Sequence, residues 1–265
     1  DVFLSGGSTS PFRISTSGVP EPTLLGRRWY IGGSSADDEA RERMRAFLLR
    51  NDVSDTNIFA QDLRAANADS FEASDSLRAA QENEEPLVTE FGGDSFGSQL
   101  QVVAGTIQRQ PYLNVPRQIF YVSAGGFDTH SGQANSLPDR HTALANAIAA
   151  FKSAMLELGR WNDVAVFTMS DFGRTLNDNG DGTDHGWGGH HFVVGGAVRG
   201  GDIYGEVPPA TIGHDQEVGG GRLIPSLAVD QYAAQFGRWF GLAPSEIEFA
   251  LPNLNRFSPP DWNFI

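Results

Sequence analysis

A short glycine-rich stretch, residues 182–192, carries half of the histidines of this chain. Its residues with ligand chemistry are Asp184, His185, His190 and His191. Clustered glycines indicate unusual backbone conformations or close approaches of the backbone, and imidazoles beside carboxylates are typical ligands of divalent metals. The stretch therefore predicts a metal site. The alternative is a surface loop whose histidines pack on Trp187.

Two further polar motifs have side chains that suit the same chemistry. Asp128 and His130 lie two residues apart, and in an extended segment residues i and i+2 point the same way, so both can bind one ion. Asp171 directly follows an apolar run, and Arg174 can hold an oxyanion through a bidentate contact. The alternatives are that Asp128 caps a turn and hydrogen-bonds to His130, that Asp171 caps a turn, and that Arg174 pairs with Asp171.

The acidic segment 177–184 raises the question of calcium. Its spacing, Asn-x-Asn-x-Asp-Gly-x-Asp, resembles the first half of a calcium loop. Gly188 stands where the bidentate glutamate of such a loop is expected, which favours a flexible acidic turn. The sequence has no Gly-x-Ser-x-Gly elbow, no P-loop and no dinucleotide-binding glycine fingerprint. Its chemistry is therefore expected to rest on Asp and His, with Arg or a hydroxyl group as further candidates.

Composition narrows the functional classes. The 265 residues suffice for one large domain with a sizeable core. The net charge of −14 and the absence of a basic patch argue against a nucleic-acid partner, and no apolar run is long enough to span a membrane. Because the chain has no cysteine, disulfides, thiolate nucleophiles and cysteine-ligated zinc are excluded.

Hydrophobic periodicity predicts the elements that must position these residues. Helices are expected at 36–50, 56–82, 97–109, 138–158 and 227–240, with a short one after Pro244. Strands are expected at 117–123, 163–169 and 192–197. The helix at 138–158 has the clearest apolar face, formed by Leu144, Ile148, Phe151, Met155 and Leu158. Gly159 is expected to end it.

The order strand, helix, strand over residues 117–169 predicts a β-α-β unit with parallel strands and a right-handed crossover. Open α/β sheets bind ligands at the carboxyl ends of their strands. We therefore expect Asp128, His130 and Asp171 to converge at this edge, with His185 and His190 nearby.

Three motifs together resemble one bacterial family. They are Gly-Gly-Phe-Asp-Thr-His-x-x-Gln, Ser-Asp-Phe-Gly-Arg-Thr and Gly-Thr-Asp-His-Gly-Trp-Gly-Gly-His-His. They resemble the domain-of-unknown-function 1501 family, which is grouped with the alkaline phosphatase and sulfatase superfamily. The resemblance covers about residues 117–254 and implies an alkaline-phosphatase-like α/β fold, a three-layer α/β/α sandwich with a largely parallel central sheet.

The resemblance also implies a domain organisation and a location. Residues 1–265 are expected to form a single domain, with a helical and irregular part at 1–116 and the motif-bearing core at 117–254. Because the superfamily's nucleophile-bearing first strand is not found, the chain is expected to be the carboxyl-terminal part of a longer protein. Family members commonly look exported, so we expect a periplasmic or extracellular location.

Residue roles carry over only where the motifs match. The metal ligands implied in this way are Asp128, His130, Asp171 and His185. Phe172 stands where the superfamily pattern has a histidine, so Asp184 or His190 is expected to replace that ligand. Arg174, His190 or His191 is expected to steady the anion during catalysis.

The expected function is that of a metal-dependent hydrolase of phosphate or sulfate esters. The cofactor is a divalent metal, with zinc, calcium, magnesium and manganese all open, and the substrate is a small or polymeric anionic ester. The missing amino-terminal portion of the same protein is a candidate partner. The competing hypothesis is an exported, non-catalytic binding or structural protein on a degenerate hydrolase fold.

Overall fold

The structure is a computed structural model that describes residues 85–113 and 116–265 continuously. It also describes residues 2–4, 12–14 and scattered positions between 42 and 79. The chain divides into two compact units. Unit 1 comprises Asp1–Ala124 and Asn146–Ala154, and unit 2 comprises Gly125–Ala145 and Met155–Ile265.

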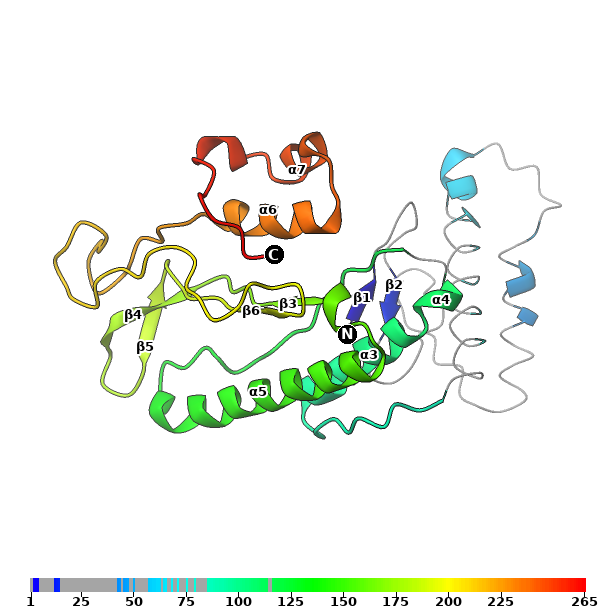
Figure 1. Cartoon of the computed structure of the whole chain (residues 1–265), viewed down its shortest axis with the longest axis horizontal. Helices are drawn as coiled ribbons and strands as arrows, with labels where there is room; N and C mark the ends of the chain where they lie inside the picture. The colour runs from blue at the N-terminus through cyan, green and yellow to red at the C-terminus, as the bar shows by residue number, and fades with distance from the viewer. Residues whose placement is uncertain are drawn as a thin grey trace. The chain divides into compact units, whose positions relative to one another are not determined.

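The part of unit 1 that the structure describes includes one small sheet, helices α3 (Ser95–Gln108) and α4 (Gln110–Leu113), and residues 146–154 of a longer helix. Strands β1 (Val2–Leu4) and β2 (Phe12–Ile14) pair antiparallel. Helix α3 confirms the helix predicted at 97–109, and the short α4 follows it (Figure 1). The Asp94 side chain starts α3 by accepting the N–H groups of the first turn.

The two helices predicted at 36–50 and 56–82 lie largely outside the described residues. The described positions within them are helical, as at residues 58–62, except Arg50 and Asn57.

Helix α5 (Gln133–Glu157) is the longest described helix (Figure 1). Its predicted apolar face is confirmed, because Phe151 and Met155 are buried and Leu144 and Ile148 are partly buried. Gly159 ends it with a φ of 66°, in the left-handed region that glycine occupies without strain. The helix begins five residues earlier than the sequence predicts.

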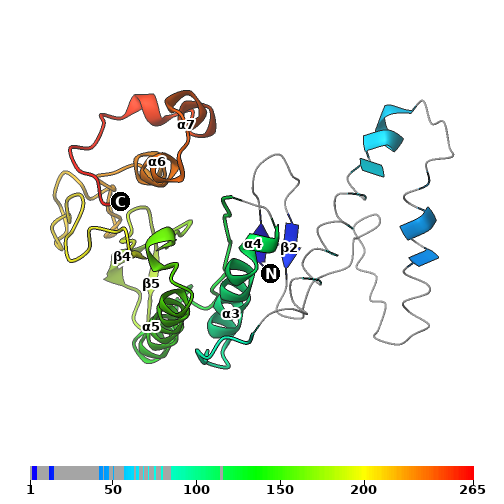
Figure 2. The same ribbon diagram turned by 45° about the vertical axis from the view of Figure 1, so that its right-hand side comes forward.

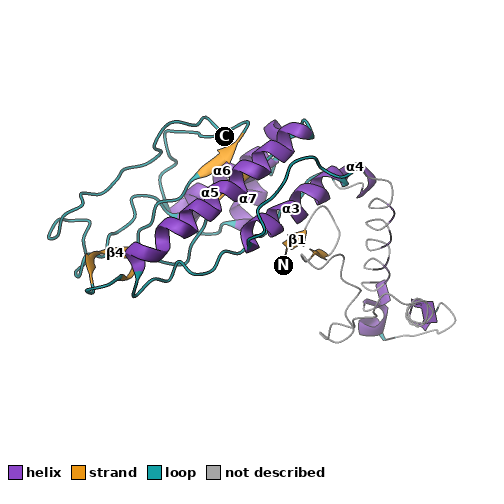
Figure 3. Cartoon of the chain, turned by 90° about the horizontal axis from the view of Figure 1, so that it is seen from below, coloured by secondary structure: helices purple, strands orange, loops and turns teal. Residues whose placement is uncertain are grey.

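Unit 2 holds the remaining elements, joined by long loops (Figures 2 and 3). Its strands are β3 (Ala165–Phe167), β4 (Gly173–Asp178), β5 (Thr183–Gly186) and β6 (Val193–Gly195). Its later helices are α6 (Val229–Phe240) and α7 (Pro244–Ala250), as the sequence predicts. Two short 3-10 helices are η1 (Trp161–Asp163) and η2 (Leu254–Arg256).

The predicted α/β/α sandwich with a parallel central sheet is wrong. The described residues form three sheets of two strands each, and all three pairs are antiparallel. Strand β3 pairs with β6, and β4 pairs with β5. The β-α-β unit is therefore not formed, and the functional side chains cannot lie along the edge of a parallel sheet.

The β-α-β unit is not formed because both of its predicted strand segments have other partners. Residues 117–123 form no strand beyond a single bridge residue at Ile119. At the end of this segment, the Gln99 side chain accepts from Ser123 N at 3.0 Å and donates to Ser123 O at 2.9 Å. The second segment, β3, pairs with the strand that returns after the β4–β5 hairpin. This pairing is extended by the bond from Thr168 N to Phe192 O.

The core of unit 2 is aromatic. Phe236 on α6 stacks on Phe167 of β3 with ring centroids 4.0 Å apart, and it also contacts Tyr232 and Phe264. These contacts attach α6 to the β3–β6 pair. None of the helices in the described part of the chain combines the length and apolar character that a membrane crossing needs.

Candidate metal centre

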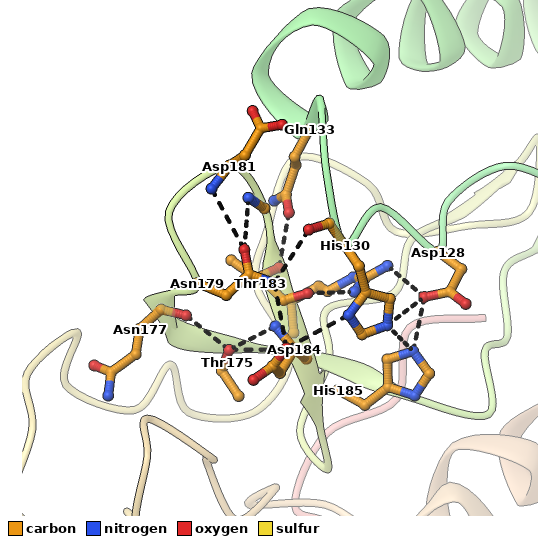
Figure 4. A network of polar contacts seen from close by, with 12 residues as sticks. Asp128, His130, Gln133, Thr175, Asn177, Asn179, Asp181, Thr183, Asp184 and His185 are labelled. Carbon is orange, nitrogen blue, oxygen red and sulfur yellow. Dashed lines mark hydrogen bonds and ion pairs between the residues drawn. The ribbon is translucent and has the colours of Figure 1, made fainter.

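Three donor atoms from two chain segments meet in unit 2 (Figure 4). The Oδ1 atom of Asp128 lies 2.8 Å from His185 Nε2 and 3.0 Å from His130 Nε2. The two Nε2 atoms are 3.2 Å apart. In the described part of the chain, this is the one group of three or more histidine and carboxylate side chains whose donor atoms converge. All three side chains are about half exposed, so a solute can reach them.

The β4–β5 hairpin positions His185. Arg174 on β4 pairs in register with His185 on β5, and its guanidinium reaches across to the Asp128 segment. It donates to Thr183 O at 2.7 Å, to Phe127 O at 2.6 Å and to Asp128 Oδ1 at 3.1 Å. Arg174 therefore joins the two segments that carry the donor atoms.

The turn of the hairpin positions His130 by fixing the start of α5. The Asp181 carboxylate accepts from Gly132 N at 2.9 Å, and its backbone carbonyl accepts from Gln133 N at 3.1 Å. A carboxylate at a helix N-terminus is stabilised by the helix dipole. This contact explains why α5 begins before Pro138, because the cap comes from a residue distant in sequence.

The acidic segment 177–184 comprises the turn of this hairpin and the adjoining ends of β4 and β5. Its side-chain oxygens accept backbone N–H groups of the turn itself: Asp178 accepts from Gly180, and Asn179 accepts from Gly182. These bonds explain the spacing that resembled a calcium loop, since Asn and Asp side chains commonly stabilise turns in this way.

Outer contacts orient both imidazoles. The Nδ1 atom of His130 lies 3.4 Å from Asp184 Oδ1, which also accepts from the Asn179 amide at 3.3 Å. Ligating histidines commonly present their second ring nitrogen to a carboxylate in this manner. The ring of Phe172 stacks on His185 with centroids 4.0 Å apart. The Arg174 guanidinium in turn lies over Phe172, at 4.9 Å.

The electrostatics keep the carboxylate charged. The pKa of Asp128 lies below its usual value, mainly because His185 hydrogen-bonds to it. Desolvation opposes this shift, while the charges of His185 and His130 and the hydrogen bond from Arg174 add to it. Asp128 is thus anionic at neutral pH, the form that binds a cation.

The three donors fit a divalent ion. Neighbouring ligands of a zinc ion with bonds of about 2.0–2.1 Å lie roughly 3.3 Å apart in tetrahedral geometry. The observed separations of 2.8, 3.0 and 3.2 Å all lie below this value, so a slight widening of the group would let one ion contact all three atoms. Two imidazoles and a carboxylate are also a common donor set for such ions.

Of the other predicted site residues, only Asp184 has a described contact with a histidine of this group. Asp184 contacts His130 from the outer side, as described above. Asp171 is exposed in the loop between β3 and β4, outside the three-residue group, and its role as a ligand stays a prediction. His190 is exposed and also lies outside the group.

His191 has its own set of contacts. Its Nδ1 atom lies 3.3 Å from Thr168 Oγ1, and its ring stacks on Tyr232. Burial lowers the pKa of His191, and the neighbouring His190 adds to this effect. Both effects favour the neutral form of the ring.

Sequence reasoning missed the residues that support the site. They are Phe172, Thr175, Asn179, Asp181, Gly182 and Gln133. The signal for Phe172 was present, because it departs from the superfamily pattern. The contacts of Asn179 and Asp181 to His130 and to α5 span about 50 positions, which no local pattern reveals.

Comparison with known proteins is consistent with the motif resemblance. The model of a family described as proteins of unknown function, DUF1501, matches residues 32–220, which include all three donor residues. No curated protein and no solved structure matches the chain. Because the match covers well over half of the sequence, the chain belongs to the DUF1501 family.

Proposed function

We propose that the protein is an exported metal-dependent hydrolase of phosphate or sulfate esters. The observation that carries the proposal is the convergence of Asp128, His130 and His185, whose donor atoms face one another within 3.2 Å at an exposed site. A site with three protein ligands leaves coordination positions open, as catalytic metal sites do.

Each residue of the site would have a separate role in hydrolysis. Asp128 supplies an anionic oxygen, and His130 and His185 supply ring nitrogens. A divalent ion held there would polarise the ester oxygens and lower the pKa of a water molecule. Asp184 orients His130, and Arg174 keeps Asp128 beside the hairpin. His191 is a candidate to accept a proton from the attacking group.

The proposed chemistry is that of the alkaline phosphatase and sulfatase superfamily, although the described residues form no parallel sheet. The support is therefore the ligand set and the three motifs rather than the fold. The same resemblance supports the proposal that the protein is periplasmic or extracellular.

A non-catalytic binding or structural protein is the second candidate. The observation that favours it is the stacking of Phe172 on His185, because the superfamily pattern has a metal-binding histidine at the position of Phe172. A site that keeps the ligands of one ion and loses those of a second can bind a metal without catalysing hydrolysis.

Metal content and hydrolysis measured on one sample test the proposal. The protein is stripped with a chelator, reloaded separately with zinc, manganese, magnesium or calcium, and assayed with p-nitrophenyl phosphate and p-nitrophenyl sulfate. We expect hydrolysis of one ester with one of these ions and its loss in Asp128→Asn. The matched control is Asp202→Asn, whose exposed carboxylate accepts only its neighbour's N–H among the bonds described.

The two candidates give different results. Stoichiometric metal without hydrolysis of either ester would favour the binding protein. Hydrolysis that survives in a folded Asp128→Asn variant would remove the proposed site.

A further inference from the structure

A threonine hydroxyl and an imidazole meet at the end of the β3–β6 pair. Thr168 directly follows β3, and Phe192 directly precedes β6. Phe192 N donates to Thr168 Oγ1 at 3.1 Å, and Thr168 Oγ1 lies 3.3 Å from His191 Nδ1. Because the hydroxyl oxygen already accepts one hydrogen bond, its own proton is available for Nδ1. A hydroxyl that donates to an imidazole in this way is the arrangement of a nucleophile with its general base.

Tyr232 holds both members of this pair. Its phenol donates to Thr168 O at 3.3 Å, and its ring stacks on the His191 imidazole. Tyr232 itself packs edge-on against Phe167 and Phe236 in the aromatic core of unit 2. A base needs such a third group to keep it oriented toward its nucleophile. Burial lowers the pKa of His191, which favours the neutral ring that can take up a proton.

The surroundings of the pair suit an uncharged, apolar ester. His191 is exposed and Thr168 is partly buried, and the adjacent Met169 and Phe192 are apolar side chains that are 58% and 41% exposed. Among the described residues, no lysine or arginine is bonded to Thr168 or His191 that could balance a phosphate or sulfate charge. The N–H of Met169 has no hydrogen-bond partner in the described part of the chain. The N–H of the residue after a nucleophile is a donor that hydrolases use to stabilise the oxyanion of acyl transfer.

We infer that Thr168 and His191 form a second catalytic pair, which hydrolyses carboxylic esters with apolar acyl groups. This activity differs from the proposed function in its substrate class, and it uses none of the three donor residues of the metal centre.

The reaction has two steps. The Thr168 oxygen bonds to the ester carbonyl carbon while its proton passes to His191 Nδ1, and the ester C–O bond then breaks as His191 returns the proton to the departing alcohol. In the second step His191 takes a proton from water, which attacks the acyl-threonine. The carboxylic acid leaves and the Thr168 hydroxyl regains its proton from His191.

p-Nitrophenyl butyrate is the probe, because its acyl group is apolar and its release of nitrophenolate is visible. The full chain is assayed in the presence of a chelator, and samples quenched in acid are digested and searched by mass spectrometry for a butyrylated peptide. The variants are Thr168→Val, Thr168→Ser and His191→Gln. Thr142→Val is the matched control, since its exposed hydroxyl donates only to Pro138 O among the bonds described. Circular dichroism and the Tm establish that each variant is folded.

Wild type should hydrolyse the ester despite the chelator, and the butyryl group should be found on Thr168. Thr168→Val and His191→Gln should lower the rate by about 100-fold or more, the lower end of what a general base contributes. Thr168→Ser should keep the acyl intermediate, and Thr142→Val should match the wild type.

Loss of hydrolysis on chelation, absence of a butyryl group from Thr168, or a wild-type rate in a folded Thr168→Val variant would overturn the inference. If Thr168→Val does not fold, the position of the butyryl group in the wild-type chain decides. The phosphate and sulfate esters are assayed separately on metal-loaded protein, so either activity can fail without the other.

Discussion

Arg174 acts at a point where two chain segments meet. From its charge, the sequence predicts an anion-binding residue, yet its guanidinium is directed at Phe127 O, Thr183 O and Asp128 Oδ1. It is mostly shielded from solvent, with 21% of its side chain exposed. Hydrogen bonds made by a charged group in such a position contribute more than those of neutral groups. Its main role is therefore to hold Asp128 beside β5.

Replacing Arg174 by Met should lower the free energy of unfolding by about 1.5–3 kcal/mol, because two carbonyls and a carboxylate lose a charged donor. Arg174→Lys should recover only part of this, since an ammonium group lacks the planar fork that reaches three acceptors. Urea titration measures both variants. Arg160→Met is the control: its ion pair with Asp163 is exposed and should contribute about 0–1 kcal/mol. Equal losses for Arg160 and Arg174 would contradict the positioning role.

Asp184 contacts His130 at Nδ1 and not at the donor atom Nε2. Replacing Asp184 therefore leaves all three donor atoms of the group in place. Asp184→Ala should therefore weaken metal binding by about 10–100-fold, the range for outer partners of a ligating histidine. Asp184→Asn should lie between this variant and the wild type, because the amide oxygen can still accept from Nδ1. Isothermal titration with zinc provides the affinities. An Asp184→Ala protein that fails to bind at all would instead place Asp184 among the direct ligands.

At the scale of elements, the β4–β5 hairpin depends on one close approach of the backbone. A Cβ atom on Gly182 would lie 2.5 Å from the His130 carbonyl carbon and 2.5 Å from Thr129 O. Only glycine permits the turn to reach the segment that carries His130.

Gly182→Ala should therefore separate the hairpin from His130 and reduce both the Tm and the zinc affinity. Gly200→Ala is the matched control, because a Cβ there meets nothing within 4 Å. Differential scanning calorimetry and zinc titration compare the two. If Gly182→Ala kept the wild-type zinc affinity, the turn would have no part in placing His130.

The loop at residues 213–223 also contacts the β4–β5 hairpin. Gly221 O accepts from Leu176 N on β4, and Leu223 O accepts from Gly188 N after β5, both at 2.9 Å. Glu217 organises this loop: its carboxylate accepts from Gly221 N at 2.8 Å and from Gly213 N at 3.3 Å. The bond from Gly221 is the main reason that the pKa of Glu217 lies below its usual value of 4.5.

The sign of this shift predicts a pH dependence. A carboxyl group whose pKa is lower in the folded state stabilises the fold fully above its unfolded pKa and loses this effect as the pH falls through the folded pKa. Wild type should therefore have a higher Tm than Glu217→Gln above about pH 5.5, and the difference should shrink below pH 4.5. Thermal scans at several pH values measure it. A difference that stays constant or grows in acid would contradict this account.

The elements were predictable where the signal was local. The 3-to-4-residue spacing from Leu144 to Met155 predicted α5, and the apolar runs predicted β3 and β6. The pairing of the strands was not predictable, because periodicity indicates that a strand exists but does not identify the strand that lies beside it. Gln99 shows why: one amide side chain satisfies both backbone groups of Ser123, which sequence patterns assign to a strand partner.

At the scale of the whole molecule, the site was partly predictable. Asp128, His130 and His185 were all recognised by residue type and spacing, although the sheet expected to assemble them is not formed. The β4–β5 hairpin and its contact with α5 assemble them instead. Because 55 residues separate His130 from His185, an ion bound between them would crosslink distant parts of the chain.

Such a crosslink should appear as metal-dependent stability. An ion that binds only the folded chain stabilises it by about 2.7 kcal/mol when its free concentration is 100 times its Kd. Adding a chelator should therefore lower the Tm of wild type, and restoring zinc should raise it again with increasing concentration. His185→Ala, which lacks one donor, should show little response. An identical response in this variant would indicate that the stabilising ion binds elsewhere.

The turn at residues 179–182 has a practical consequence for labelling the protein. Hairpin tips are normally good places to insert an affinity tag or a fluorophore-accepting peptide, since chains tolerate additions there. This tip is fastened to the first residues of α5 through Asp181, so an insertion there would detach the helix start and the neighbouring imidazole together. The glycines Gly200 and Gly201 offer a better position, because a Cβ atom added at either one meets nothing within 4 Å.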